Sequence, residues 1–250
     1  MAPFPSARVH QNGTIVNAVD LYLDTNGTLW VLDSGYVNTL RRPVKEGPPK
    51  VIALDADTGK ILKEIDISSV VRGKAGYLSV DERARGPKYL YISDGPSRSI
   101  AVWNIGTHKG HVVVLPKLVK KRTGFSVLYT VLIRRKLYLT YFGSNEIFYI
   151  DSDALQKGGK IVKVGMKDPR MVILGSKGYN IIFRLAGRPE IISWDTRQKL
   201  LEKNLEVIDK GSLEMNPMAV VQGYGRLWVL ESNLHSYLNG SRTTHNFRLI

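Results

Sequence analysis

Five stretches of this sequence repeat one pattern, in which a run of apolar and aromatic residues stops at a polar residue or a turn. The clearest two are residues 29–35 (LWVLDSG) and 227–233 (LWVLESN). The five runs begin near residues 29, 89, 137, 181 and 227, so the spacings are 60, 48, 44 and 46 residues. Short strands at such a spacing are typical of β-propeller blades, whereas a β-sandwich would not produce it. The pattern therefore predicts an all-β fold in which each run is an inner-type strand of a blade.

The length of the chain limits the number of blades. Five inner-type strands fit into 250 residues, and the segment before Ala18 is too short for a further complete blade. A propeller of six blades at this repeat length needs roughly 270–300 residues. We therefore expect a single β-propeller domain over residues 1–250, with about five complete blades or fewer and with its first blade largely missing.

The charge of the chain favours anionic partners. The formal net charge is +14 at pH 7, and basic residues cluster at positions 41–42, 117–122, 134–136 and 157–167. Such a surface attracts anions by long-range steering, although a solvated basic face without a dedicated partner explains the same pattern. No zinc motif, RNA-binding aromatic pair or basic helix accompanies the charge, so we expect no nucleic-acid function.

Three further features of the sequence bear on its compartment. No stretch approaches the roughly 20 apolar residues of a membrane helix, and the N-terminus lacks the pattern of a signal peptide, which taken alone suggests the cytosol. The chain has no cysteine, which excludes disulfides, cysteine nucleophiles and thiolate metal sites. Sequons at Asn12, Asn26 and Asn239 permit glycosylation if the protein is secreted.

Four segments, taken together and in order, resemble a known family. They are residues 29–38 (LWVLDSGYVN), 48–59 (PPKVIALDADTG), 89–94 (YLYISD) and 226–233 (RLWVLESN). Any one of them alone would be a weak indication. As a set, they resemble the insect yellow and major royal jelly proteins over nearly the whole chain.

The resemblance implies a secreted six-bladed β-propeller with a role in cuticle pigmentation, in nutrition or in binding small aromatic amines in the central channel. A dopachrome-converting activity is attributed to some members of the family. This sequence departs from the family because it shows no signal peptide, lacks about one blade ahead of residue 29, and has Gly47 where a disulfide cysteine is usual. We therefore interpret the chain as an N-terminally incomplete or divergent member, and expect an extracellular location by resemblance.

Three carboxylates stand at the ends of inner-type strands, namely Asp33, Asp94 and Glu231. If they converge at one mouth of the channel, they could form strong charge-assisted hydrogen bonds with the ammonium group of a ligand. The alternative is that each caps a turn by accepting backbone N–H bonds. The resemblance adds Asn233 and His235, since amine-binding relatives have an Asn and an aromatic residue just past the last inner strand. We predict these five as ligand-binding residues.

Catalytic and metal chemistry have weaker support in the sequence. No Gly-x-Ser-x-Gly elbow surrounds Ser34 or Ser232, which argues against a hydrolase triad. His108 and His111 lie three residues apart beside a glycine, which fits an exposed hairpin tip better than a metal site. We therefore predict no metal and no cofactor, and name only Asp33, Asp94 and His235 as weak catalytic candidates.

The function that we expect is non-catalytic. It is a secreted protein that binds a small aromatic, catechol-derived or biogenic-amine ligand in the central channel, or that is associated with cuticle pigmentation. The first alternative is a dopachrome-converting isomerase in melanin formation, which would need a carboxylate or imidazole with a matched pKa. The second is a structural or storage protein without a ligand.

Overall fold

The structure is a computed structural model of the chain. It describes residues 4–39, 41–84, 86–119, 124, 126–157, 159–212, 214–223, 226–240, 242 and 244–250. The helices in this part are α1 (Ala7–Gln11), α2 (Ser152–Leu155), α3 (Leu234–Leu238) and the 3-10 turn η1 (Glu202–Asn204). No helix of the described residues has the length and apolarity that a membrane crossing requires.

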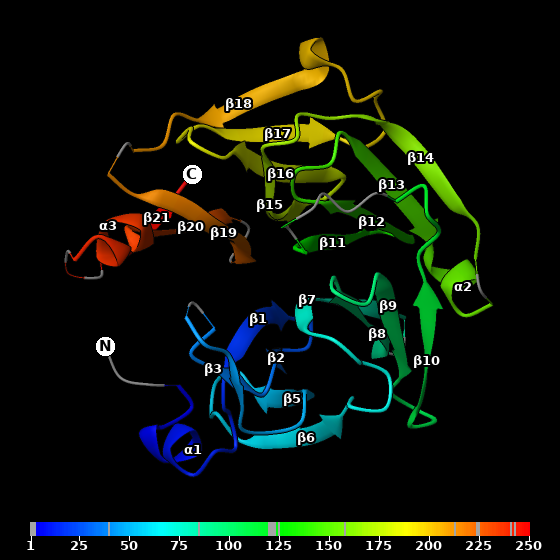
Figure 1. Cartoon of the computed structure of the whole chain (residues 1–250), viewed down its shortest axis with the longest axis vertical. Coiled ribbons are helices and arrows are strands. Elements are labelled where there is room, and N and C mark those ends of the chain that lie inside the picture. The colour runs from blue at the N-terminus through cyan, green and yellow to red at the C-terminus, as the bar shows by residue number, and fades with distance from the viewer. Residues whose placement is uncertain are drawn as a thin grey trace. The chain divides into compact units, whose positions relative to one another are not determined.

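Antiparallel sheets make up most of the fold, and they follow one another along the chain (Figure 1). The first sheet has the order β1 (Ala18–Leu23), β2 (Thr28–Asp33), β5 (Lys50–Asp55) and β6 (Ile61–Asp66). The second has the order β10 (Lys109–Val114), β9 (Ser99–Asn104), β8 (Gly86–Asp94) and β7 (Ala75–Arg83). The third has the order β11 (Leu128–Ile133), β12 (Lys136–Tyr141), β13 (Glu146–Asp151) and β14 (Ile161–Met166).

The remaining sheets complete the series. The fourth has the order β15 (Met171–Lys177), β16 (Asn180–Leu185), β17 (Ile191–Asp195) and β18 (Leu205–Asp209). The last has the order β19 (Asn216–Gly223), β20 (Arg226–Ser232) and β21 (His245–Leu249), and a small ribbon pairs β3 (Tyr36–Val37) with β4 (Val44–Lys45). These five sheets are a five-bladed β-propeller arrangement, so the predicted all-β propeller with about five blades is confirmed.

The apolar runs found in the sequence are β2, β8, β12, β16 and β20, and each is the second strand of its sheet. Beside each of them lies an edge strand that precedes it in the chain, namely β1, β7, β11, β15 or β19. The sequence predicts these runs as inner-type strands because they are the most apolar. They are apolar because each lies between two neighbouring strands of its sheet. Edge strand β1 instead alternates, and it leaves Leu21 and Leu23 exposed.

The chain divides into two compact units. The first, unit 1, contains Met1–Leu118, Ser126–Leu132 and Ser152–Gly159. The second, unit 2, contains Val119–Phe125, Ile133–Asp151 and Lys160–Ile250. The single propeller domain expected for residues 1–250 stays a prediction.

The core of unit 1 lies between the faces of its sheets. Trp30 and Leu32 of β2 pack in one buried cluster with Leu90 and Ile92 of β8. The indole Nε1 of Trp30 donates a hydrogen bond to the carboxylate of Asp24 at 2.9 Å, so the only polar atom of that buried ring is satisfied.

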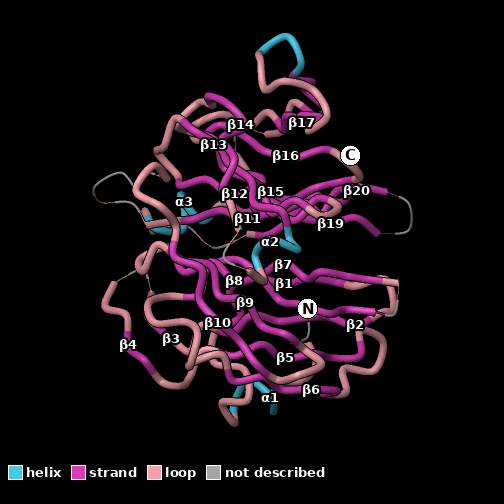
Figure 2. Tube along the Cα trace, turned by 90° about the vertical axis from the view of Figure 1, so that its right-hand side faces the viewer, coloured by secondary structure: helices cyan, strands magenta, loops and turns pink. Residues whose placement is uncertain are grey.

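The other face of the first sheet is covered by the N-terminal segment. Val9 of α1 and Ile15 pack against Val31, Ile52 and Leu54, and Figure 2 shows α1 beside β5 and β6. Burial on both faces explains why β2 and β5 are nearly continuous apolar runs.

Helix α2 also belongs to unit 1, although it follows β13 in the chain. Arg83 of β7 forms an ion pair with Asp153 at 3.0 Å. The Nε2 atom of His111, on β10, donates to the carbonyl oxygen of Leu155 at 3.0 Å. These bonds attach α2 to the second sheet.

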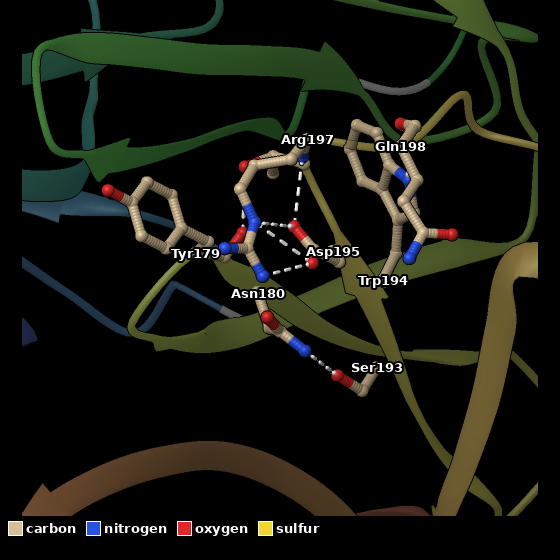
Figure 3. A network of polar contacts seen from close by, with 8 residues as sticks. Tyr179, Asn180, Ser193, Trp194, Asp195, Arg197 and Gln198 are labelled. Atoms are coloured by element: carbon tan, nitrogen blue, oxygen red, sulfur yellow. Dashed lines mark hydrogen bonds and ion pairs between the residues drawn. The ribbon is translucent and has the colours of Figure 1, made fainter.

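In unit 2, buried residues of the fourth and last sheets share one cluster that includes Ile182, Ile191, Val220 and Val229. Trp194 of β17 is fully buried, and Figure 3 shows its ring beside Gln198, whose carbonyl oxygen accepts a hydrogen bond from Nε1 at 3.2 Å. The ring also meets Tyr138 edge-on, with 6.1 Å between the ring centroids.

Candidate functional site

The carboxylate of Asp33, at the end of β2, holds together the loops around it. It is fully buried and accepts hydrogen bonds from the backbone N–H groups of Val16 at 2.7 Å, Asn17 at 3.0 Å and Gly35 at 2.8 Å. Gly35 has a φ of +69°, a left-handed conformation that glycine adopts at little cost. These contacts are those of a capping residue.

Asp94 has the same role at the end of β8. It is fully buried, and its carboxylate accepts backbone N–H bonds from Arg72 at 3.1 Å, Gly73 at 2.7 Å, Lys74 at 3.1 Å and Ser97 at 3.2 Å. Capping, the alternative that the sequence left open, thus describes the contacts of both aspartates. Their roles in ligand binding and catalysis stay predictions.

Glu231, on β20 of unit 2, is paired with a cation of the protein itself. Its carboxylate is buried and accepts a hydrogen bond from Nε of Arg248 at 2.9 Å. The other two guanidinium nitrogens of Arg248 bind Asp209 at 2.6 and 2.5 Å. This bidentate pairing lowers the pKa of Asp209 and raises that of Arg248, because each charge stabilises the other.

The remaining predicted ligand-binding residues lie just after β20. Asn233 closes the loop before β21, since its side chain donates to the carbonyl of Arg242 at 2.8 Å and accepts from the N–H of Thr244 at 2.6 Å. His235 belongs to α3, and its side chain lies outside what the structure describes. The five predicted residues are therefore divided, with Asp33 and Asp94 in unit 1 and the other three in unit 2.

The three sequon asparagines Asn12, Asn26 and Asn239 are all exposed. In the first sequon, the side-chain oxygen of Asn12 accepts hydrogen bonds from both the backbone N–H and the hydroxyl of Thr14, at 3.0 and 2.8 Å. The sequons therefore satisfy the accessibility that glycosylation requires, and the modification itself stays a prediction.

A cluster that the sequence did not predict lies in unit 1, on three edge strands. It consists of Asp20 on β1, Tyr77 on β7 and Tyr129 on β11. The carboxylate of Asp20 accepts the backbone N–H of Leu78 at 2.7 Å, which fixes it beside the neighbouring Tyr77. The rings of Tyr77 and Tyr129 lie with their centroids 5.0 Å apart and their planes tilted by 49°.

Burial sets the electrostatics of this cluster. It raises the pKa of Asp20 from 3.8 to about 6, although the N–H groups of Leu78 and Leu21 oppose the shift. It also raises the pKa of Tyr77, with further contributions from Tyr129 and Asp20. At pH 7 the cluster therefore presents the carboxylate of the partly buried Asp20 beside the neutral phenol of Tyr77, an environment that suits a cation with an aromatic ring.

Two further hydrogen bonds join β1 and the turn after it to β7. The hydroxyl of Tyr22, two residues after Asp20, donates to the carboxylate of Glu82 at 2.7 Å. The backbone N–H of Thr25 donates to the other oxygen of Glu82 at 3.0 Å. Because these bonds fix the two strands, the position of Asp20 relative to Tyr77 is fixed as well.

One signal in the sequence could have indicated Asp20. An acidic residue in the middle of an apolar strand is uncommon, and residues 18–23 (AVDLYL) place Asp20 there. Nothing in the sequence, however, indicates that Leu78 and Tyr77 would be its neighbours, because the pairing joins residues 58 positions apart.

Comparison with protein families gives one match over most of the chain. Residues 16–250 match the family described as Major royal jelly protein. Among curated proteins, Major royal jelly protein 6 of Apis mellifera is 22% identical over 246 residues, covering 83% of this chain and 54% of the relative. Major royal jelly protein 2 of Apis mellifera is 22% identical over 252 residues, covering 88% and 55%. The chain thus spans about half the length of these relatives.

Solved structures share the fold at low sequence identity. A chain in the crystal structure of the Nidogen/Laminin complex matches with a TM-score of 0.57 and 13% identity, covering 86% of this chain and 72% of that one. Virginiamycin B lyase from Staphylococcus aureus matches with a TM-score of 0.51 and 14% identity, covering 92% and 69%. These likenesses show the fold alone.

Proposed function

This chain belongs to the major royal jelly protein family, and we propose that it binds a small aromatic or catechol-derived amine through Asp20, Tyr77 and Tyr129. The protein acts outside the cell in this proposal, and it is a binding protein, not an enzyme. A role in cuticle pigmentation would follow if the bound amine is a catechol.

The proposal rests on the contacts and the raised pKa of the Asp20 carboxylate. Two backbone N–H groups bond to it, at 2.7 and 3.0 Å, and its raised pKa of about 6 means that its charge is poorly compensated. A ligand ammonium group would supply the missing positive charge through a charge-assisted hydrogen bond. The rings of Tyr77 and Tyr129 would then offer π-faces to the aromatic part of the same ligand.

The raised pKa of Asp20 also favours one alternative function. A group that gains and loses a proton near pH 6 is suited to general acid–base catalysis, because its pKa lies close to the operating pH. Dopachrome conversion is a reaction of this class, since it moves a proton within the substrate. Asp20 would be the proton-transfer group, with the phenol of Tyr77 beside it as a hydrogen-bond donor.

Calorimetric titration with serotonin and dopamine, together with a dopachrome-decay assay, separates these functions. We expect saturable binding without turnover, and an affinity about 10- to 100-fold lower for Asp20→Asn, as expected for loss of a charged hydrogen bond. The matched control is Asp57→Asn, which removes the same charge from an exposed turn of unit 1 and should change affinity less than twofold.

The other outcomes of the same measurements are distinct. Turnover that disappears in Asp20→Asn, and is kept in Asp57→Asn, would establish the isomerase in place of the binding protein. If both the titrations and the decay assay show no effect, the proposal fails and a structural or storage role takes its place. Equal loss of affinity in both variants would show a general charge effect and would exclude Asp20 as the binding group.

A further inference from the structure

Unit 2 carries a group of cations around one exposed tyrosine, which we call the basic rim. It comprises Arg134 in the turn before β12, Lys136 at the start of β12, Lys177 at the end of β15, and Arg197 and Lys199 after β17, all exposed. Tyr179, 37% exposed, lies among them in the turn between β15 and β16. The proposed amine site lies in unit 1, so the basic rim is a separate feature.

Contacts at Tyr179 join the turn between β15 and β16 to the turn before β12 and to the turn after β17. The guanidinium carbon of Arg134 lies 4.9 Å from the centroid of the Tyr179 ring, and that of Arg197 lies 4.6 Å from it. Thr196 donates both its N–H, at 3.0 Å, and its hydroxyl, at 2.7 Å, to the carbonyl oxygen of Tyr179. Two guanidinium groups are therefore fixed at one ring, at a cost in mutual repulsion that the ring's π-electrons partly offset.

Most of the positive charge of the basic rim is uncompensated. Arg197 is paired with Asp195 through bonds of 2.6–3.1 Å, as Figure 3 shows. Among the residues that the structure describes, Arg134, Lys136, Lys177 and Lys199 make no ion pair with a carboxylate. Four exposed cations without acidic partners favour a negatively charged partner that extends along the surface.

We propose that the basic rim binds the sulfate groups of an acidic polysaccharide. Arg134 offers planar donors that match the oxygen atoms of a sulfate ester, and the three lysines offer further point charges along the chain of sugars. The cations lie on three separate turns of unit 2, so successive sulfates of one extended polymer can each meet a cation. A single small anion would use only one of them.

The two guanidinium groups beside the Tyr179 ring argue against a single-stranded nucleic acid as the partner. Proteins that bind single strands stack bases on exposed aromatic faces. Tyr179 has a guanidinium group against its ring from both Arg134 and Arg197. The Nζ atom of Lys136 likewise lies 4.6 Å from the centroid of the Tyr149 ring. Rings already engaged by cations leave charge, not stacking, as the means of recognition.

The test uses the full chain and a heparin oligosaccharide as the probe, with affinity measured in 150 mM NaCl. The triple variant Arg134→Gln, Lys177→Gln, Lys199→Gln should bind about tenfold more weakly than the parent. The matched control, Lys60→Gln, Lys74→Gln, Lys109→Gln, removes the same charge from exposed positions of unit 1 and should lose less than twofold. Equal thermal midpoints of the three proteins would show that the fold is kept.

Two results would overturn the proposal. An equal loss in the two triple variants, or no measurable binding of heparin by the parent chain, would mean that the basic rim is not a dedicated site. Single-stranded or duplex DNA of matched charge that binds the parent more tightly than heparin, and loses affinity in the first variant, would assign the surface to nucleic acid. De-sulfated heparin should bind at least tenfold more weakly than heparin, and equal binding would exclude recognition of sulfate.

Discussion

Asp94 and Asp20 are both carboxylates of unit 1, but the backbone compensates their charges to different extents. Asp94 is fully buried and accepts four backbone N–H bonds. Asp20 is half-buried and accepts two. The first uses its charge to hold a loop, whereas the second keeps hydrogen-bonding capacity for another partner. The four donors of Asp94 match those of a structural carboxylate, whereas the two donors of Asp20 leave the cost of burying its charge partly uncompensated.

The largest effect that we expect from this difference is on stability. Asp94→Ala leaves four backbone N–H groups without an acceptor in a buried loop, so it should lower the free energy of unfolding by about 3–5 kcal/mol. Urea denaturation measures this loss. The exposed control Asp57→Ala should stay within about 0.5 kcal/mol of the parent, and a loss below about 1 kcal/mol for Asp94→Ala would remove the capping role.

The second effect is the pH dependence of stability. Because the pKa of Asp20 is raised to about 6 in the folded chain and is 3.8 unperturbed, the folded state binds the proton more tightly. The cost of burying the charge is fully present above pH 6 and disappears as the pH falls toward 4. The parent should therefore gain about 2 kcal/mol of stability relative to Asp20→Asn between pH 7.5 and pH 4. If the parent and Asp20→Asn differ in stability by the same amount at both pH values, this prediction is wrong.

The third effect is on ligand affinity. An amine that binds the ionised carboxylate of Asp20 should lose about tenfold in affinity between pH 7.5 and pH 5, because only about one carboxylate in ten is ionised one pH unit below its pKa. Titration of dopamine at both pH values measures this. Asp20→Asn should bind weakly at both, and an unchanged affinity of the parent at pH 5 would remove Asp20 from the site.

The smallest effect concerns the phenol hydroxyls. Tyr129→Phe keeps the ring and removes one hydroxyl, so amine affinity should fall two- to threefold, about 0.5 kcal/mol. Tyr129→Leu removes the ring and should cost more than Tyr129→Phe. If the two variants bind equally, the ring does not contact the ligand.

The sequence predicted the strands and the blade spacing because both are local or periodic properties. The run at residues 227–233, for example, became β20 with the expected polar end at Glu231. The candidate site was not predictable to the same extent. Whether Asp33 caps a loop depends on Val16 and Asn17, and whether Asp20 meets Tyr77 depends on how β1 packs against β7 of the next sheet. Such contacts join distant residues, and neither residue type nor spacing shows them.

The attachment of α2 to the second sheet has a consequence for the order in which the chain folds during synthesis. The strands of the first two sheets are complete at Val114, but Asp153 and Leu155, which bind Arg83 and His111, follow about 40 residues later. At about 5–20 residues per second, a ribosome needs roughly 2–8 seconds to add them. During that interval the second sheet lacks its later partner, so we expect nascent chains from which residues 1–118 have emerged to be more sensitive to protease than chains from which residues 1–159 have emerged.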